Sequence, residues 1–111
     1  MLAKDFDEIV EQRIKKIKEV LQSKATEYAS DNDRLHNFKR AAKVGEITAA
    51  MALKGMLLKH LVSIFDMIDK YNPDTGPQFS MDLINEKCGD LINYTILLEA
   101  LFKEPYNEKS K

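Results

Sequence analysis

Hydrophobic residues recur every three or four positions along most of the chain, which is the spacing of one face of an α-helix. Residues 5–28 predict an amphipathic helix whose apolar face carries Val10, Ile14, Ile17, Leu21 and Tyr28. Residues 47–71 predict a longer helix with one apolar face, formed by Leu53, Leu57, Leu61, Ile64, Phe65 and Ile68. No segment alternates with the two-residue period of a half-buried strand.

Turn and capping residues divide these helices from one another. A polar run at 30–33 is rich in N-cap residues and predicts a short helix over 33–44, with Gly45 as its C-terminal cap. Residues 72–77 predict a loop. A last helix is expected over 80–103, with Ser80 as N-cap, and Pro105 should end it ahead of a flexible tail at 105–111.

These elements predict an all-α fold, a small bundle of three long helices and one short helix in a single domain spanning 1–111. The last helix is apolar around most of its circumference from Leu91 to Leu98, which is typical of a central helix or a subunit interface. A domain of 111 residues buries only about two-thirds of its unfolded surface. We therefore expect a homo-oligomer, either a dimer or a tetramer.

Composition narrows the functional classes. Seventeen basic and eighteen acidic residues nearly cancel, so no global field favours nucleic acid or an anionic membrane. The single cysteine, Cys88, excludes an intramolecular disulfide and a multi-cysteine zinc cage. The N-terminus lacks the apolar run of a secretory signal, and no apolar stretch reaches the length of a membrane span. We expect a cytoplasmic protein with no membrane partner.

The candidate chemistry begins with a polar stripe on the last helix. Glu86, Asp90 and Asn93 are spaced by four and three, so they share one face within an arc of about 60°. Leu97 continues the same stripe. Carboxylates one turn apart can share Mg²⁺, which prefers oxygen ligands and substrate phosphates. The alternative is a polar patch at the mouth of the bundle, or hydrogen bonding at a dimer interface.

The preceding long helix carries Lys59, Ser63 and Asp66 at the same kind of spacing. A solvated surface is the default interpretation of this stripe, with Lys59 as the best candidate for binding phosphate. His60 lies beside it at the edge of the apolar face. It is either structural or an acid, base or ligand.

The third candidate is the octet 31–38, which opens the short helix. A helix N-terminus favours anions, Arg34 can fork onto a phosphate, and Phe38 can stack on a base. His36 and Asn37 add hydrogen-bonding groups. The alternative is a capping turn followed by an amphipathic helix with Phe38 in the core.

Together these residues resemble a known family. They are Tyr28, Asp31-Asn32-Asp33-Arg34 and His36-Asn37-Phe38, then Lys59-His60, then Glu86-Lys87, Asp90 and Asn93-Tyr94. Over about residues 24–101 the chain resembles small phage and prophage proteins that carry the nucleotide-modification-associated domain. It is also similar to the all-α MazG-like nucleoside triphosphate pyrophosphatases.

The resemblance implies hydrolysis between the α and β phosphates of a nucleotide, with Mg²⁺ held by acidic motifs on two helices. Asp90 matches the last acid of the second motif, whereas Glu86 lies one position off and Lys87 takes the usual place of the acid. The first motif is absent, since its helix offers Lys59, His60 and Asp66 instead of three glutamates.

The leading hypothesis is therefore a MazG-like nucleotide-binding domain, with or without Mg²⁺-dependent hydrolysis. Glu86, Asp90 and Asp66 would hold the metal, and Glu86, Asp90 and His60 would be catalytic. The nucleotide would be bound by Arg34, His36, Asn37, Phe38, Lys59, Lys87, Asn93 and Tyr94.

The alternative hypothesis is a non-enzymatic helical module of phage type that binds or inhibits a host protein through the apolar last helix. A third reading is a nucleic-acid-binding bundle that uses Lys39, Arg40 and Lys43, against which the near-neutral charge argues.

Overall fold

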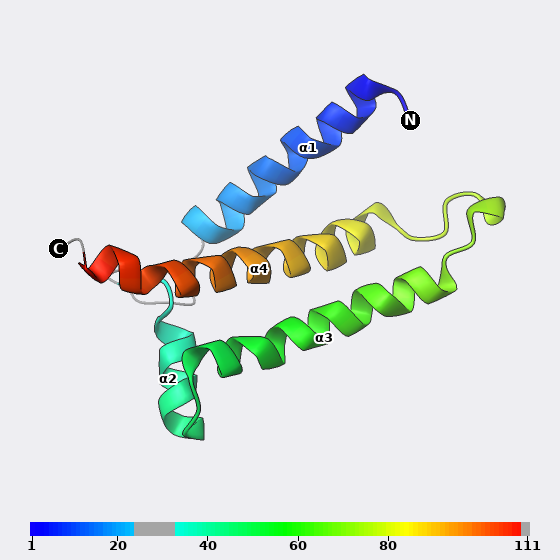
Figure 1. Ribbon diagram of the computed structural model, residues 1–111. Helices are drawn as coiled ribbons and strands as arrows, with labels where there is room; N and C mark the ends of the chain where they lie inside the picture. The colour runs from blue at the N-terminus through cyan, green and yellow to red at the C-terminus, as the bar shows by residue number, and fades with distance from the viewer. Residues whose placement is uncertain (24–32, 110–111) are drawn as a thin grey trace.

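The computed structural model describes residues 1–23 and 33–109, and these residues form an all-α fold (Figure 1). Its α-helices are α1 (Ala3–Lys18), α2 (His36–Gly45), α3 (Ala49–Lys70) and α4 (Met81–Lys109). A π-helical segment, η1 (Glu19–Ser23), extends α1, and a 3₁₀ turn, η3 (Pro73–Thr75), lies between α3 and α4. The all-α prediction is confirmed.

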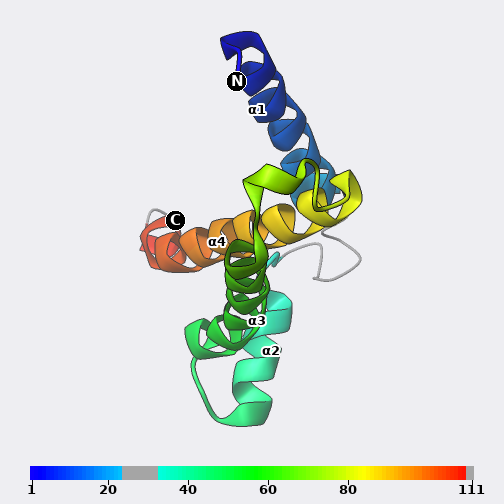
Figure 2. The ribbon, with the colours of Figure 1, turned by 90° about the vertical axis from the view of Figure 1, so that its right-hand side faces the viewer.

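Helix α4 is the middle layer of the molecule. Figures 1 and 2 show α1 on one side of α4 and α3 on the other, with the short α2 lying across the start of α3. The molecule is elongated, with principal extents of 51 × 29 × 24 Å. Within the chain, the apolar last helix thus has the central position that was one of its two predicted placements.

Side-chain caps fix where α3 and α4 begin, and the cap at Ser80 confirms the sequence prediction. The Ser80 hydroxyl accepts from the Leu83 amide at 3.1 Å, and the Thr48 hydroxyl accepts from the Met51 amide at 3.1 Å. Each bond satisfies an N–H that the first helical turn leaves without a partner. In the predicted loop, the Asn72 side chain accepts from the Asp74 amide at 3.1 Å.

Two predicted helix ends are wrong. Helix α4 continues through Pro105 to Lys109, so the tail expected at 105–111 is helical as far as the structure describes it. Proline near a helix end removes only one backbone hydrogen bond, which the rest of a 29-residue helix tolerates. Helix α2 includes Gly45, and the left-handed cap is Glu46, with a φ of 55°.

Other predicted positions lie outside the described residues. The first helix is expected to reach Tyr28, and α1 with η1 covers it as far as Ser23. The polar break is described only from Asp33 onward. Among the described residues no single helix is long and apolar enough to cross a membrane, and only the pair α2 and α3, bent by 104°, passes that test together.

The fully buried core is small. Leu35, Ala42 and Leu53 are the buried apolar side chains in the described part of the chain, and Leu53 is 0% exposed. Leu53, Leu57 and Ile64 lie on the inner side of α3, as expected, but Phe65 and Ile68 are exposed. The apolar surface of α3 is therefore wider than the side that α4 and α2 cover.

Helix α1 is held to α4 by an arginine over a glycine. The Arg13 guanidinium donates to the Asn85 carbonyl at 3.3 Å. It also lies so close to Gly89 that a Cβ there would stand 2.6 Å from the Arg13 Nη1 atom. Gly89 thus leaves room for the Arg13 Nη1 atom against α4, although most of α1 remains exposed.

One lysine joins the start of α2 to the end of α4. The Lys39 ammonium lies 2.7 Å from the Asp33 carboxylate and 2.6 Å from that of Glu104. The hydrogen bond from Lys39 lowers the pKa of Asp33. The two carboxylates raise the pKa of Lys39. Lys39 is thus engaged within the fold rather than available to nucleic acid.

This cluster should give the fold an acid-sensitive component. Because the pKa of Asp33 is lower in the folded state, its stabilising effect is present above about pH 4 and is lost as the pH falls through the folded pKa. Asp33→Asn keeps the oxygen that accepts from Leu35 and removes the charge. We expect it to reduce stability at pH 7 by up to about 1 kcal/mol, because the pair is partly exposed.

Urea unfolding of both proteins between pH 3 and pH 7 measures this effect. The difference between them should shrink as the pH falls below about 4. Asp7→Asn, at an exposed position on α1, is the control and should change stability by less than about 0.5 kcal/mol throughout. A difference for Asp33→Asn that stays constant with pH would contradict the prediction.

Candidate ligand-binding site

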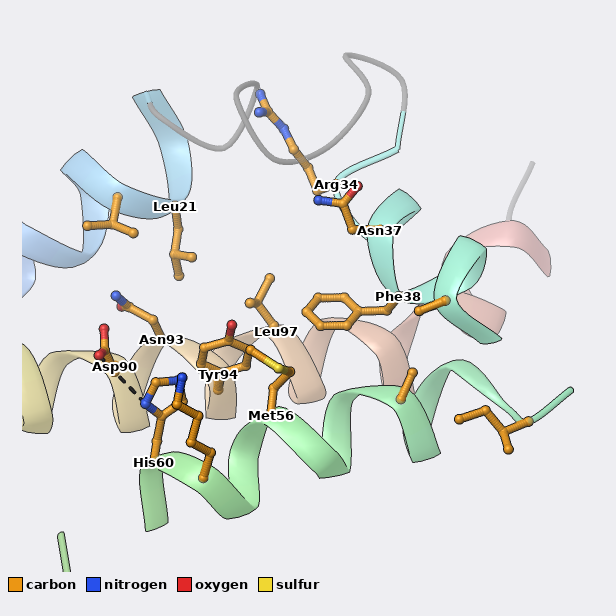
Figure 3. A pocket seen from close by; sticks show the side chains of 15 residues that line it. Leu21, Arg34, Asn37, Phe38, Met56, His60, Asp90, Asn93, Tyr94 and Leu97 are labelled. Carbon is orange, nitrogen blue, oxygen red and sulfur yellow. Dashed lines mark ion pairs between the residues drawn. The ribbon is translucent and has the colours of Figure 1, made fainter. Parts of the chain in front are cut away.

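A large cavity opens where α2, α3 and α4 meet the end of η1 (Figure 3). Its volume is about 790 Å³, within the range of about 300–1,000 Å³ typical of small-molecule pockets. The lining is mostly apolar, with a few polar groups that converge on it. Such a lining is typical of a site that buries a ring and orients it through a few hydrogen bonds.

Three rings from three helices form one wall of this cavity. The Tyr94 ring on α4 stacks on the His60 ring on α3, with centroids 4.7 Å apart and planes inclined by 30°. The Phe38 ring on α2 meets Tyr94 edge-on, with centroids 6.3 Å apart. The sequence left Phe38 either in the core or at the site. It is half-buried and lines the cavity.

A carboxylate, that of Asp90, lies beside the stacked rings. The Asp90 carboxylate lies 3.6 Å from the His60 Nδ1 atom, just beyond hydrogen-bond distance. Burial, and secondarily the nearby Asp90 charge, raises the pKa of Tyr94. Tyr94 therefore keeps its proton at neutral pH and offers a neutral O–H, which suits binding rather than nucleophilic chemistry.

The amide of Asn93 gives the cavity an unsatisfied polar group. Its Oδ1 atom is buried and has no hydrogen-bond partner among the residues that the structure describes. A buried acceptor without a donor costs about 1–3 kcal/mol, so such groups are rare and call for an explanation. Asn93 lines the cavity, in agreement with Figure 3, and a rotation of its amide would bring Oδ1 to an N–H of a bound molecule.

Two cations complete the lining. Arg34 comes just before α2 and Lys59 lies on α3, one residue before His60. Neither forms an ion pair with a carboxylate in the part of the chain that the structure describes. Exposed, unpaired cations at the edge of an apolar cavity favour an anionic group on the ligand.

The structure gathers many of the residues predicted for the site and separates others from it. Those that line the cavity are Arg34, Asn37, Phe38, Lys59, His60, Asp90, Asn93 and Tyr94. The predicted residues that do not line it are His36, Asp66, Glu86 and Lys87. Glu86 is largely exposed and its nearest cation is Lys87, at 4.0 Å.

The described residues do not fit the magnesium site that the resemblance implies. Within 1–23 and 33–109, no three His, Cys, Asp or Glu side chains come together in a way that could hold a metal ion. Of the three expected metal ligands, Asp90 lines the cavity, whereas Glu86 and Asp66 do not. One carboxylate paired with a histidine is a poor site for a hard cation that needs several oxygen ligands.

Sequence reasoning missed much of the apolar lining. Val20 and Leu21 from η1, and Met56 from α3, contribute to the cavity. The position of Met56 one turn before His60 is a signal that could have placed it there. For the η1 residues no local signal exists, since their role depends on how η1 approaches α4.

The chain matches no protein-family model, no curated protein and no solved structure.

Proposed function

We propose that this protein binds a nucleotide in the cavity between α2, α3 and α4. The observation that carries the proposal is the meeting, in one pocket, of a ring wall, a buried amide oxygen without a donor, and two unpaired cations. These groups are complementary to a base with an N–H and to a phosphate. The resemblance of the sequence to nucleotide-modification-associated and MazG-like proteins favours the same ligand class.

The positions of these groups would fix the orientation of the nucleotide in the cavity. Asn93 and Tyr94 are one residue apart on α4, so the base would lie against this helix with its N–H toward the Asn93 Oδ1 atom. Stacking on aromatic side chains contributes about 1–3 kcal/mol per base. The phosphates would then extend toward Lys59 and Arg34, which line the same cavity from α3 and the start of α2.

The proposed function is binding without a hydrolytic step. Hydrolysis by metal-activated water needs a fixed metal site, and Asp90 is the only one of the three expected ligands at the cavity. Asp90 instead lies beside the His60 ring, 3.6 Å from its Nδ1 atom. Affinity should therefore persist when divalent cations are removed.

Calorimetric titration with each dNTP and NTP, in EDTA and in Mg²⁺, tests this proposal. We expect at least one nucleotide to bind in EDTA, and Lys59→Gln to weaken it about tenfold, as for loss of one charge-assisted bond. Lys70→Gln, at the far end of α3, is the matched control and should leave affinity unchanged. If no nucleotide binds at about 1 mM, the proposal is contradicted. A dissociation constant of 1 mM corresponds to a binding free energy of only about −4 kcal/mol.

A further inference from the structure

The chain exposes far more surface than a compact protein of its size. Its accessible surface is 8676 Å² for a mass of 12.7 kDa, whereas a compact monomer of that mass exposes about 6,200 Å². Its radius of gyration is 16.8 Å, against about 13 Å for a compact domain of this length. The excess surface is larger than the roughly 800 Å² that each partner buries in a standard interface.

Part of this surface is an apolar stripe on the outer side of α3. Met51, Leu58, Val62 and Phe65 are spaced by seven, four and three residues. Each of these side chains is between 47% and 55% exposed. The stripe lies away from Leu53, which faces the interior. Spacings of three, four and seven are those by which one helix packs along another.

We propose that Leu58, Val62 and Phe65 of this stripe bind the same three residues of a second copy, with the two α3 helices antiparallel about a two-fold axis. The axis would pass between Leu61 and Val62. Leu58 then lies level with the partner's Phe65. Val62, beside the axis, meets the partner's Val62. An isologous interface requires such self-complementarity, because both copies present one surface.

Charges at the ends of the stripe favour a second copy over a different protein. Lys54 and Asp69 are equally far from the centre between Leu61 and Val62, so each lies level with the opposite charge on the partner. Neither forms an ion pair within the described part of the chain. The net charge of −1 gives no repulsion between copies. Self-pairing of the two α3 helices would bring these opposite charges together at both ends of the interface.

The interface is independent of the ligand pocket. None of the four stripe residues lines the cavity. A failure of either proposal would therefore leave the other intact, and the two can be measured separately. Substitutions at Val62 are also compatible with folding, because the side chain is exposed and both Glu and Lys favour a helix more than Val does.

Light scattering after gel filtration tests the proposal with charged variants of Val62. The wild-type protein should have a mass of about 25 kDa, twice that of the 12.7 kDa chain. Val62→Glu and Val62→Lys each place like charges across the axis, and each should weaken association at least about a hundredfold. An equal mixture of the two variants should restore a dimer, since the charges are then opposite.

Val44→Glu is the matched control, because Val44 is an exposed apolar residue on α2 outside the stripe. It should leave the dimer intact. A wild-type monomer at 100 μM would overturn the proposal. So would an oligomer that is unaffected by Val62→Glu and Val62→Lys, because its interface would then lie elsewhere or involve a partner of another kind.

Discussion

Replacing Asn93 by leucine is expected to stabilise the unliganded protein and to weaken nucleotide binding. The Asn93 Oδ1 atom is buried without a donor, so an apolar side chain of similar size removes a cost of about 1–3 kcal/mol. That gain corresponds to a melting temperature higher by roughly 4–8 °C for each kcal/mol. The same change removes the acceptor for the base N–H, and affinity should fall about tenfold or more.

Thermal unfolding and calorimetric titration of one sample measure the two effects. Asn85→Leu is the control, since Asn85 lies on the same helix but is exposed and outside the cavity. Its stability should change by less than about 0.5 kcal/mol and its affinity should not change. A variant at position 93 that loses stability would show that Asn93 serves the fold rather than a ligand.

Replacing Leu53 by alanine is expected to destabilise the fold severely. Leu53 is 0% exposed and is one of three buried apolar side chains in the described residues. Leucine-to-alanine changes in cores cost about 3–5 kcal/mol through lost transfer energy and the cavity left behind. Small domains are stable by only about 5–15 kcal/mol in total. A large part of the stability should therefore disappear.

Urea unfolding followed by circular dichroism measures this loss. Val44→Ala is the control, because Val44 is 79% exposed and its truncation should cost less than about 0.5 kcal/mol. A Leu53→Ala protein that unfolds at nearly the same urea concentration as the wild type would show that α2, α3 and α4 do not share a core at this position.

The sequence predicts those features of the fold that depend on local spacing. Apolar periodicity identifies the long helices, and the cap predicted at Ser80 rests on a single side-chain bond between residues close in sequence. Pro105 is misleading because its cost to the helix is local, whereas the stability of α4 depends on the length of the whole helix. A rule that considers one residue at a time does not include that length. The prediction that Phe65 faces the core is wrong for a similar reason. Helical spacing identifies a wide apolar surface but not the part of it that other helices cover.

The candidate site is predictable only in part. Asp90 and Asn93 of the polar stripe on α4 both line the cavity, because residues three and four apart share a helix face. The stripe also includes Glu86, one turn earlier, which lies beyond the cavity because α2 and the start of α3 cover only the later turns of α4. The stacking of His60 on Tyr94 joins residues far apart in the chain and needs the fold to be seen.

The central claim is that the cavity between α2, α3 and α4 binds a nucleotide through the chain's own groups. Backbone amide spectra recorded during titration with a nucleotide in EDTA test it most directly. The largest shifts should fall on Asn37, Lys59, Asn93 and Tyr94, which line the cavity from three helices. No shifts at millimolar nucleotide, or shifts confined to α1 and the outer side of α3, would contradict it.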